Sequence, residues 1–151
     1  MSLKARIIII VASVTCWLVA CCLPALNLLG KANTQGEQST MVGVLAFIMA
    51  FFAMLEGQFA WLANPLWFVA MVLVAIGLNR AALIVSVLAI LVAQQTWMVV
   101  GTEINGDEGG VKKYLVTSLG LGFWLWVSSF VLIAGVAAFR PRAVPQTAPA
   151  T

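Results

Sequence analysis

The sequence predicts an all-α membrane protein: a polytopic helical bundle with four transmembrane helices and one short re-entrant or interfacial helix. Composition is the first reason, because 63% of the residues are hydrophobic and only 9% are charged. In soluble domains about 45–50% of the residues are apolar and about 25% are charged. The second is the length of the apolar runs, several of which can cross about 30 Å of hydrocarbon. These features exclude a soluble globular domain, a disordered chain and a disulfide scaffold.

The first apolar run, residues 7–29, is the first predicted span. It carries no charge and would measure about 35 Å as a helix, and Pro24 predicts a kink near its end. Residues 18–21, Leu-Val-Ala-Cys, resemble the lipobox of bacterial lipoproteins, which would make Cys21 a lipidation site. Because the run continues unbroken to residue 29, a span is favoured over a cleaved signal peptide. A polar loop follows at residues 30–40.

The apolar stretch at residues 41–77 admits two topologies. As one helix it would measure about 55 Å, too long for one span, and it is interrupted twice, the second time at Asn64-Pro65. Asn64 is a suitable helix cap and Pro65 a suitable first helical residue, so separate helices are predicted over residues 41–57 and 61–78. If both cross, the chain has five spans. If the first dips in and returns, or lies at the interface, it has four.

Residues 81–101 and 114–139 complete the predicted spans, and residues 1–139 are predicted to form one transmembrane domain. The segment 140–151 is rich in proline and alanine and is predicted to be a disordered cytoplasmic tail. With four spans both termini are cytoplasmic, and this agrees with the positive-inside rule better than five spans, which divide the basic residues evenly. The cytoplasmic side then has Lys4, Arg6, Arg80, Arg140 and Arg142, and the outer side has Lys31, Lys112 and Lys113.

The break between the two middle helices is the candidate functional polar site, made of Glu56, Gln58, Asn64 and Pro65. Glu56 is the only acidic residue inside an apolar stretch, and an ionisable group at membrane depth is a functional hypothesis by default. The simpler interpretation is that it ends a short helix at the headgroup level, with Gly57 as the stop. The other three belong either to a broken helix at a transport site or to a re-entry turn capped by Asn64.

Two stripes of small residues predict close helix packing, because small side chains let membrane helices approach each other. Packing inside the protein is favoured over an oligomer face. The predicted role of each tryptophan follows from its position along its span. Trp61 and Trp97 lie at span ends and are predicted to be interfacial anchors, whereas Trp17 and Trp126 lie deeper and are predicted to make packing or lipid contacts. The stripes are Ala46, Ala50, Ala53 and Gly57 in one helix and Ala82, Ser86, Ala89 and Ala93 in another.

Two short segments carry a resemblance to other proteins. Cys-Leu-Pro-Ala-Leu at residues 22–26 and Trp-Leu-Ala-Asn-Pro-Leu at residues 61–66 are similar to paired segments in a group of small, uncharacterised bacterial inner-membrane proteins. The similarity extends over about residues 15–95. It implies a bacterial multi-span protein with Arg80 in the cytoplasm, and it implies no activity.

The expected function is therefore non-enzymatic. The chain has no histidine, and no catalytic, metal-binding or cofactor motif is present. Its scattered basic residues do not indicate nucleic-acid binding. We expect an integral protein of a bacterial inner membrane that acts as an interaction, assembly or immunity/accessory partner of another membrane protein or of its own copies. The alternative is a small channel or transporter subunit that uses the break between Glu56 and Asn64.

Overall fold

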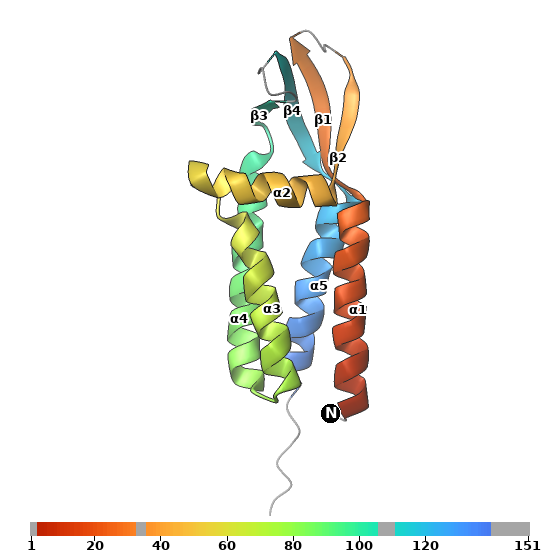
Figure 1. Cartoon of the computed structure of the whole chain (residues 1–151), viewed down its shortest axis with the longest axis vertical. Coiled ribbons are helices and arrows are strands. Elements are labelled where there is room, and N and C mark those ends of the chain that lie inside the picture. Colours follow the sequence, from red (N-terminus) through yellow and green to blue (C-terminus); the bar gives the residue numbers. More distant parts are fainter. Residues whose placement is uncertain (1–2, 33–35, 106–110, 140–151) are drawn as a thin grey trace, which may run out of the picture.

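The computed structural model describes residues 3–32, 36–105 and 111–139. Within these residues, four helices stand side by side as a bundle whose chain direction alternates, so the start of the first helix and the end of the last lie at the same end (Figure 1). A fifth helix, α2 (Gly43–Ala53), lies across the opposite end of the bundle. The bundle helices are α1 (Leu3–Cys22), α3 (Ala63–Ala75), α4 (Asn79–Ala93) and α5 (Leu121–Ala138).

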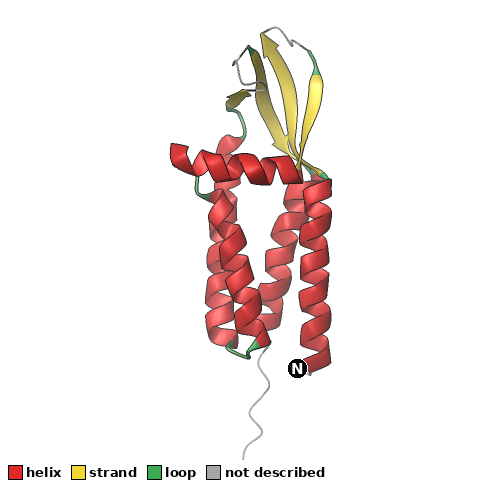
Figure 2. Cartoon of the chain, in the orientation of Figure 1, coloured by secondary structure: helices red, strands yellow, loops and turns green. Residues whose placement is uncertain are grey.

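A four-stranded antiparallel sheet projects from the same end of the bundle as α2 (Figure 2). Two segments far apart in the sequence build it, one following α1 and the other preceding α5, and its order is β2-β1-β4-β3. The all-α prediction is therefore wrong, since the chain is mostly helical but also carries this sheet. The strands are β1 (Pro24–Ala32), β2 (Gln38–Val42), β3 (Glu103–Asn105) and β4 (Lys112–Leu119).

The sheet also corrects the first and last predicted spans, residues 7–29 and 114–139, which are both too long. Helix α1 ends at Cys22 and α5 begins only at Leu121, because the apolar residues between belong to the paired central strands β1 and β4. Pro24 opens β1 instead of kinking a span, a position where a strand tolerates proline. An apolar run cannot by itself distinguish a buried strand from a helix. One cluster of buried side chains joins these strands to the last helix: Leu26, Leu28, Val116 and Leu119, packed with Phe123.

Three of the helical segments are long and apolar enough to cross a membrane: Leu3–Cys22, Asn79–Val99 and Leu121–Ala138. The second combines α4 with the short helix η3 (Gln94–Val99). Segment Ala60–Ala75, which joins η2 (Ala60–Leu62) to α3, is apolar but shorter. Large apolar side chains cover the outside of the bundle, for example Ile8 at 66% exposure and Ile84 at 62%. Such a surface matches a lipid environment better than water.

The interior of the bundle is filled by side chains. Phe130, Ile133 and Val74 are completely buried. Two buried polar groups are satisfied there: the Trp67 indole N–H donates to Ser13 Oγ at 3.0 Å, and that hydroxyl donates to the Ser129 carbonyl at 2.7 Å. These bonds link α3, α1 and α5 at the centre of the bundle, where an unpaired polar group would be costly.

Glycines allow α2 and α5 to start directly against the junction of α1 and β1. The Gly43 amide donates to the Leu23 carbonyl at 2.8 Å, and the Gly120 amide donates to the Ala25 carbonyl at 2.7 Å. A Cβ at Gly43 would collide with the Ala20 carbonyl oxygen, and one at Gly120 with the carbonyl of Pro24. Only glycine permits such a close backbone approach, so these two positions fix where the crossing helix and the last helix begin.

Candidate functional site

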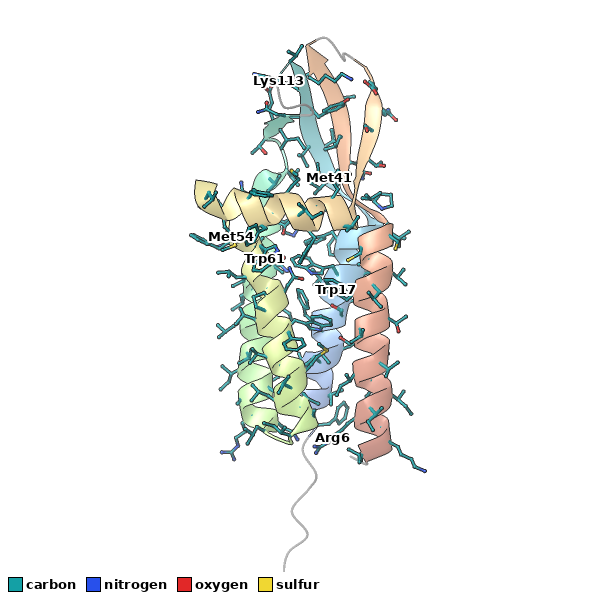
Figure 3. The ribbon with its side chains drawn as sticks, viewed as in Figure 1. Arg6, Trp17, Met41, Met54, Trp61 and Lys113 are labelled. Atoms are coloured by element: carbon teal, nitrogen blue, oxygen red, sulfur yellow. The ribbon has the colours of Figure 1, made fainter. Side chains whose placement is uncertain are left out.

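A cavity of about 570 Å³ lies between α2, the upper ends of the bundle helices and the base of the sheet. Three tryptophans from different elements line it on the bundle side: Trp17 of α1, Trp61 of η2 and Trp126 of α5. Figure 3 shows Trp17 and Trp61 beneath α2. The cavity departs from the close packing of a protein interior and forms the candidate functional site.

Asn64 joins the elements around this cavity. Its Oδ1 accepts hydrogen bonds from the indole N–H groups of Trp17 at 3.0 Å and Trp126 at 2.8 Å, and its Nδ2 donates to the Trp61 carbonyl at 3.0 Å. The prediction that Asn64 caps its helix is wrong, because α3 begins at Ala63 and no side chain caps it. The amide instead satisfies two indole donors that would otherwise be unpaired in an apolar interior.

Aromatic contacts hold α2 over the cavity. Phe47 of α2 packs edge-on against Trp17, with ring centroids 5.9 Å apart, and at 5.8 Å against Trp61. Phe51, one turn further along, packs edge-on against Trp61 at 5.2 Å. On the bundle side, Trp17 stacks on Trp67 at 5.8 Å. Helix α2 is therefore attached through two phenylalanines, and the space beside them stays open.

The small residues of α2 account for that space. Ala46, Ala50 and Ala53, the first three members of one predicted stripe, are half-buried and line the cavity. The fourth, Gly57, is exposed and adopts the left-handed conformation (φ 85°) that ends the short helix η1 (Met54–Glu56). The other stripe lies inside the bundle and is almost completely buried; it consists of Ala82, Ser86, Ala89 and Ala93.

The remaining predicted site residues are spread around the break. Gln58 is half-buried and lines the cavity, and Pro65 lies in the first turn of α3, where its missing N–H costs no helical bond. Glu56 is the last residue of η1, and its side chain lies outside the described atoms. Gln95, from the neighbouring η3, accepts a hydrogen bond from the Phe59 amide at 3.0 Å and closes the same loop.

Reasoning from the sequence missed the convergence of Trp17 and Trp126 on Asn64. The signal was present: an indole N–H deep in an apolar segment needs an acceptor, and Asn64 is the only side-chain amide in the helix predicted over residues 61–78. The sequence does not show how α1, α3 and α5 are rotated relative to one another, and this rotation decides whether the two indole donors reach the Asn64 acceptor. One donor at the site has no partner in the described structure, the buried indole N–H of Trp61.

The chemistry of the cavity wall favours an apolar occupant. Helix α2 contains no polar residue, and a helix that is apolar on every side belongs in an apolar environment. An empty cavity of about 570 Å³ would cost on the order of 10 kcal/mol at about 24 cal/mol per Å³, comparable to the whole net stability of many domains. Because the cavity is partly open, its surroundings can fill it.

Comparison with known proteins adds no family to this description. No protein-family model matches the chain, and no curated protein or solved structure is significantly similar to it.

Proposed function

We propose that the chain is a non-enzymatic integral protein of a bacterial inner membrane that acts as an interaction partner of another membrane protein. In this proposal α1, α3 with η2, α4 with η3, and α5 each cross the bilayer, α2 lies within its outer part, and the sheet stands outside. The three long apolar helices support it. So do Lys4, Arg6 and Arg80, which share the end of the bundle opposite the sheet and would be cytoplasmic.

The short third crossing is compatible with four spans because of the helix that lies across it. Segment Ala60–Ala75 would reach about 24 Å at 1.5 Å per residue, less than the roughly 30 Å of a bilayer core. Helix α2 lies directly over this segment and adds about 10 Å, the diameter of a helix. Together they would cover the full depth of the hydrocarbon.

The free edge of the sheet is the observation that carries the interaction role. Within the residues that the structure describes, β2 is an edge strand that pairs with β1 alone. The Gly30 amide donates to the Glu37 carbonyl at 2.7 Å, and because hydrogen-bonded and non-bonded pairs alternate in an antiparallel ladder, the backbone groups of Gln38 and Thr40 point away from β1. The strand has no proline or charge, the devices that usually block such edges. A partner can therefore add an extended strand there.

The test of this role uses a proline at the edge. Thr40→Pro removes an outward N–H and leaves the ladder with β1 in place, whereas Thr40→Val changes the side chain only. After crosslinking in native membranes, Thr40→Val should capture the same partner as the tagged wild type. The amount of that partner captured by Thr40→Pro should be at least tenfold lower. Equal capture by both variants would contradict the edge as the docking surface.

The topology has its own test, independent of the partner. In a chain whose three cysteines are replaced by serine, single cysteines are placed at Lys31 and Arg80 and exposed to a membrane-impermeant maleimide. Four spans predict that position 31 is labelled from outside and position 80 only after the cells are opened. Five spans would put both positions on the same side, so labelling of both in intact cells would refute the arrangement.

The alternative, a channel or transporter subunit, has less support. Conduction along the bundle would need a polar path, and the residues at its centre, Phe130, Ile133 and Val74, are large, apolar and fully buried. A conducting protein would give flux in liposomes that changes with Glu56→Gln. We expect no flux in either form.

A further inference from the structure

We infer that the cavity beneath α2 is a binding site for one long acyl chain of a bilayer phospholipid. This goes beyond the proposed interaction role and depends only on the insertion of the bundle in a membrane. The site is built by elements from the whole chain: α1, α2, η2, α3, η3, the base of the sheet and α5 all contribute to its wall.

The shape of the cavity results from the order of residues on α2. Large side chains, Phe47 and Phe51, attach the helix to the tryptophans below. Between and beside them, Ala46, Ala50 and Ala53 face the cavity and leave a gap instead of packing against a neighbouring helix. A stripe of small residues usually brings two helices into contact; here the helices are held apart by the aromatic contacts, and the space requires another occupant.

The two ends of the cavity differ in polarity. At the sheet end, Thr102, Glu103 and Asn105 line the wall, and at the bundle end the wall is formed by the indoles of Trp17 and Trp126, whose N–H groups are already bonded to Asn64. A molecule in this space therefore meets polar groups at the outer end and mainly aromatic surface further in, where the indole N–H of Trp61 has no partner in the described structure. This gradient matches a lipid with its headgroup at the sheet and its chain directed into the bundle.

The depth of the site selects a lipid over a soluble ligand. Helix α1 ends at Cys22 after about 30 Å of rise, and the bond from Gly43 to Leu23 sets the start of α2 at the same level. The exposed side of α2 carries only apolar residues, including Leu45 and Ile48. In a membrane, the side of the cavity formed by α2 is thus bordered by hydrocarbon, which can supply acyl chains.

The volume is also suitable. About 570 Å³ lies within the range of about 300–1,000 Å³ for ligand sites, and it holds roughly 19 groups the size of a water molecule at about 30 Å³ each. A methylene group is similar in size to water, so the space matches one chain of a common membrane phospholipid.

Native mass spectrometry of the purified full chain in detergent tests the inference, with 1-palmitoyl-2-oleoyl phosphatidylethanolamine as the probe. Ala50→Phe places a ring in the cavity, and Leu45→Phe places the same ring on the outer side of the same helix as the matched control. We expect wild type and Leu45→Phe to retain one phospholipid per chain, and Ala50→Phe to reduce the retained fraction at least tenfold. Equal retention by the two variants would overturn the inference, as would retention of a lipophile without an acyl chain.

A second measurement needs no change in the cavity wall. Trp97 and Trp124, which are about half exposed on the outside, are replaced by phenylalanine, and the protein is reconstituted in vesicles of phosphatidylcholine with brominated chains. Bromine quenches indoles on contact, so the fluorescence of the tryptophans lining the cavity should fall by at least half. Unchanged fluorescence in vesicles that retain the protein after alkaline extraction would refute the site alone, whereas loss of the protein on extraction would refute membrane insertion.

Discussion

Replacing Asn64 with leucine tests the hydrogen-bond network around the cavity most directly. Leucine has the same number of side-chain heavy atoms in the same branched arrangement. The substitution therefore removes the acceptor of two indole N–H groups and the donor to the Trp61 carbonyl while keeping the shape of the side chain. Membrane proteins gain about 0.6 kcal/mol per side-chain hydrogen bond on average, which gives a minimum near 2 kcal/mol for three bonds. The two indole donors left unpaired cost about 1–3 kcal/mol each, so we expect a loss of about 2–6 kcal/mol.

The matched control is Asn79→Leu. The Oδ1 of Asn79 is buried and has no hydrogen-bond partner in the described structure, so this substitution should leave the free energy of unfolding unchanged or raise it slightly. Both variants are unfolded by SDS titration in mixed micelles, with far-ultraviolet circular dichroism as the readout because it does not depend on the tryptophans. A double-mutant cycle with Trp126→Phe should give a coupling energy of about 0.5–1.5 kcal/mol. If Asn64→Leu costs less than Asn79→Leu, the network does not stabilise the fold.

Two further substitutions test how the backbone and the helices pack. Gly120→Ala, just before α5, forces a Cβ against a β1 carbonyl and should lower the free energy of unfolding by about 1–3 kcal/mol. Gly135→Ala, inside α5, meets no atom within 4 Å and should be neutral or stabilising by up to about 1 kcal/mol. Equal effects in the same SDS titration would contradict the close approach. Ala89→Leu overfills a fully buried position between helices and should also cost about 1–3 kcal/mol, and an unchanged midpoint would show that α4 does not pack as described.

Much of the helical architecture could be predicted from the pattern of apolar residues. The break near Glu56 and Asn64 separates α2 from α3, because a polar turn and a proline interrupt a run too long for one helix. The start of α3 near Asn64-Pro65 was predicted, but the role of Asn64 was not. A capping interaction is local and can be read from neighbouring residues, whereas its bonds to Trp17 and Trp126 join positions 47 and 62 residues away.

The sheet was missed for a related reason. Residues 23–29 and 114–119 are predominantly apolar, like the helices that they adjoin, and their signal for strands depends on pairing with each other across most of the chain. The alternation expected of a strand is weak here, because the central strands bury apolar side chains against the end of the bundle. Only Pro24 and Gly120 mark the boundaries, and either is compatible with a kinked helix.

The sequence by itself determined that the chain is predominantly apolar and that its long middle apolar run is divided into two helices, because composition and the length of apolar runs are local properties. The tertiary structure decided that β1 and β4 pair, that Asn64 meets two indoles, and that the alanines of α2 face a cavity and those of α4 a packed interior. These features depend on how helices rotate and cross relative to one another. That arrangement is set by many weak contacts between residues distant in sequence, and no short segment contains it.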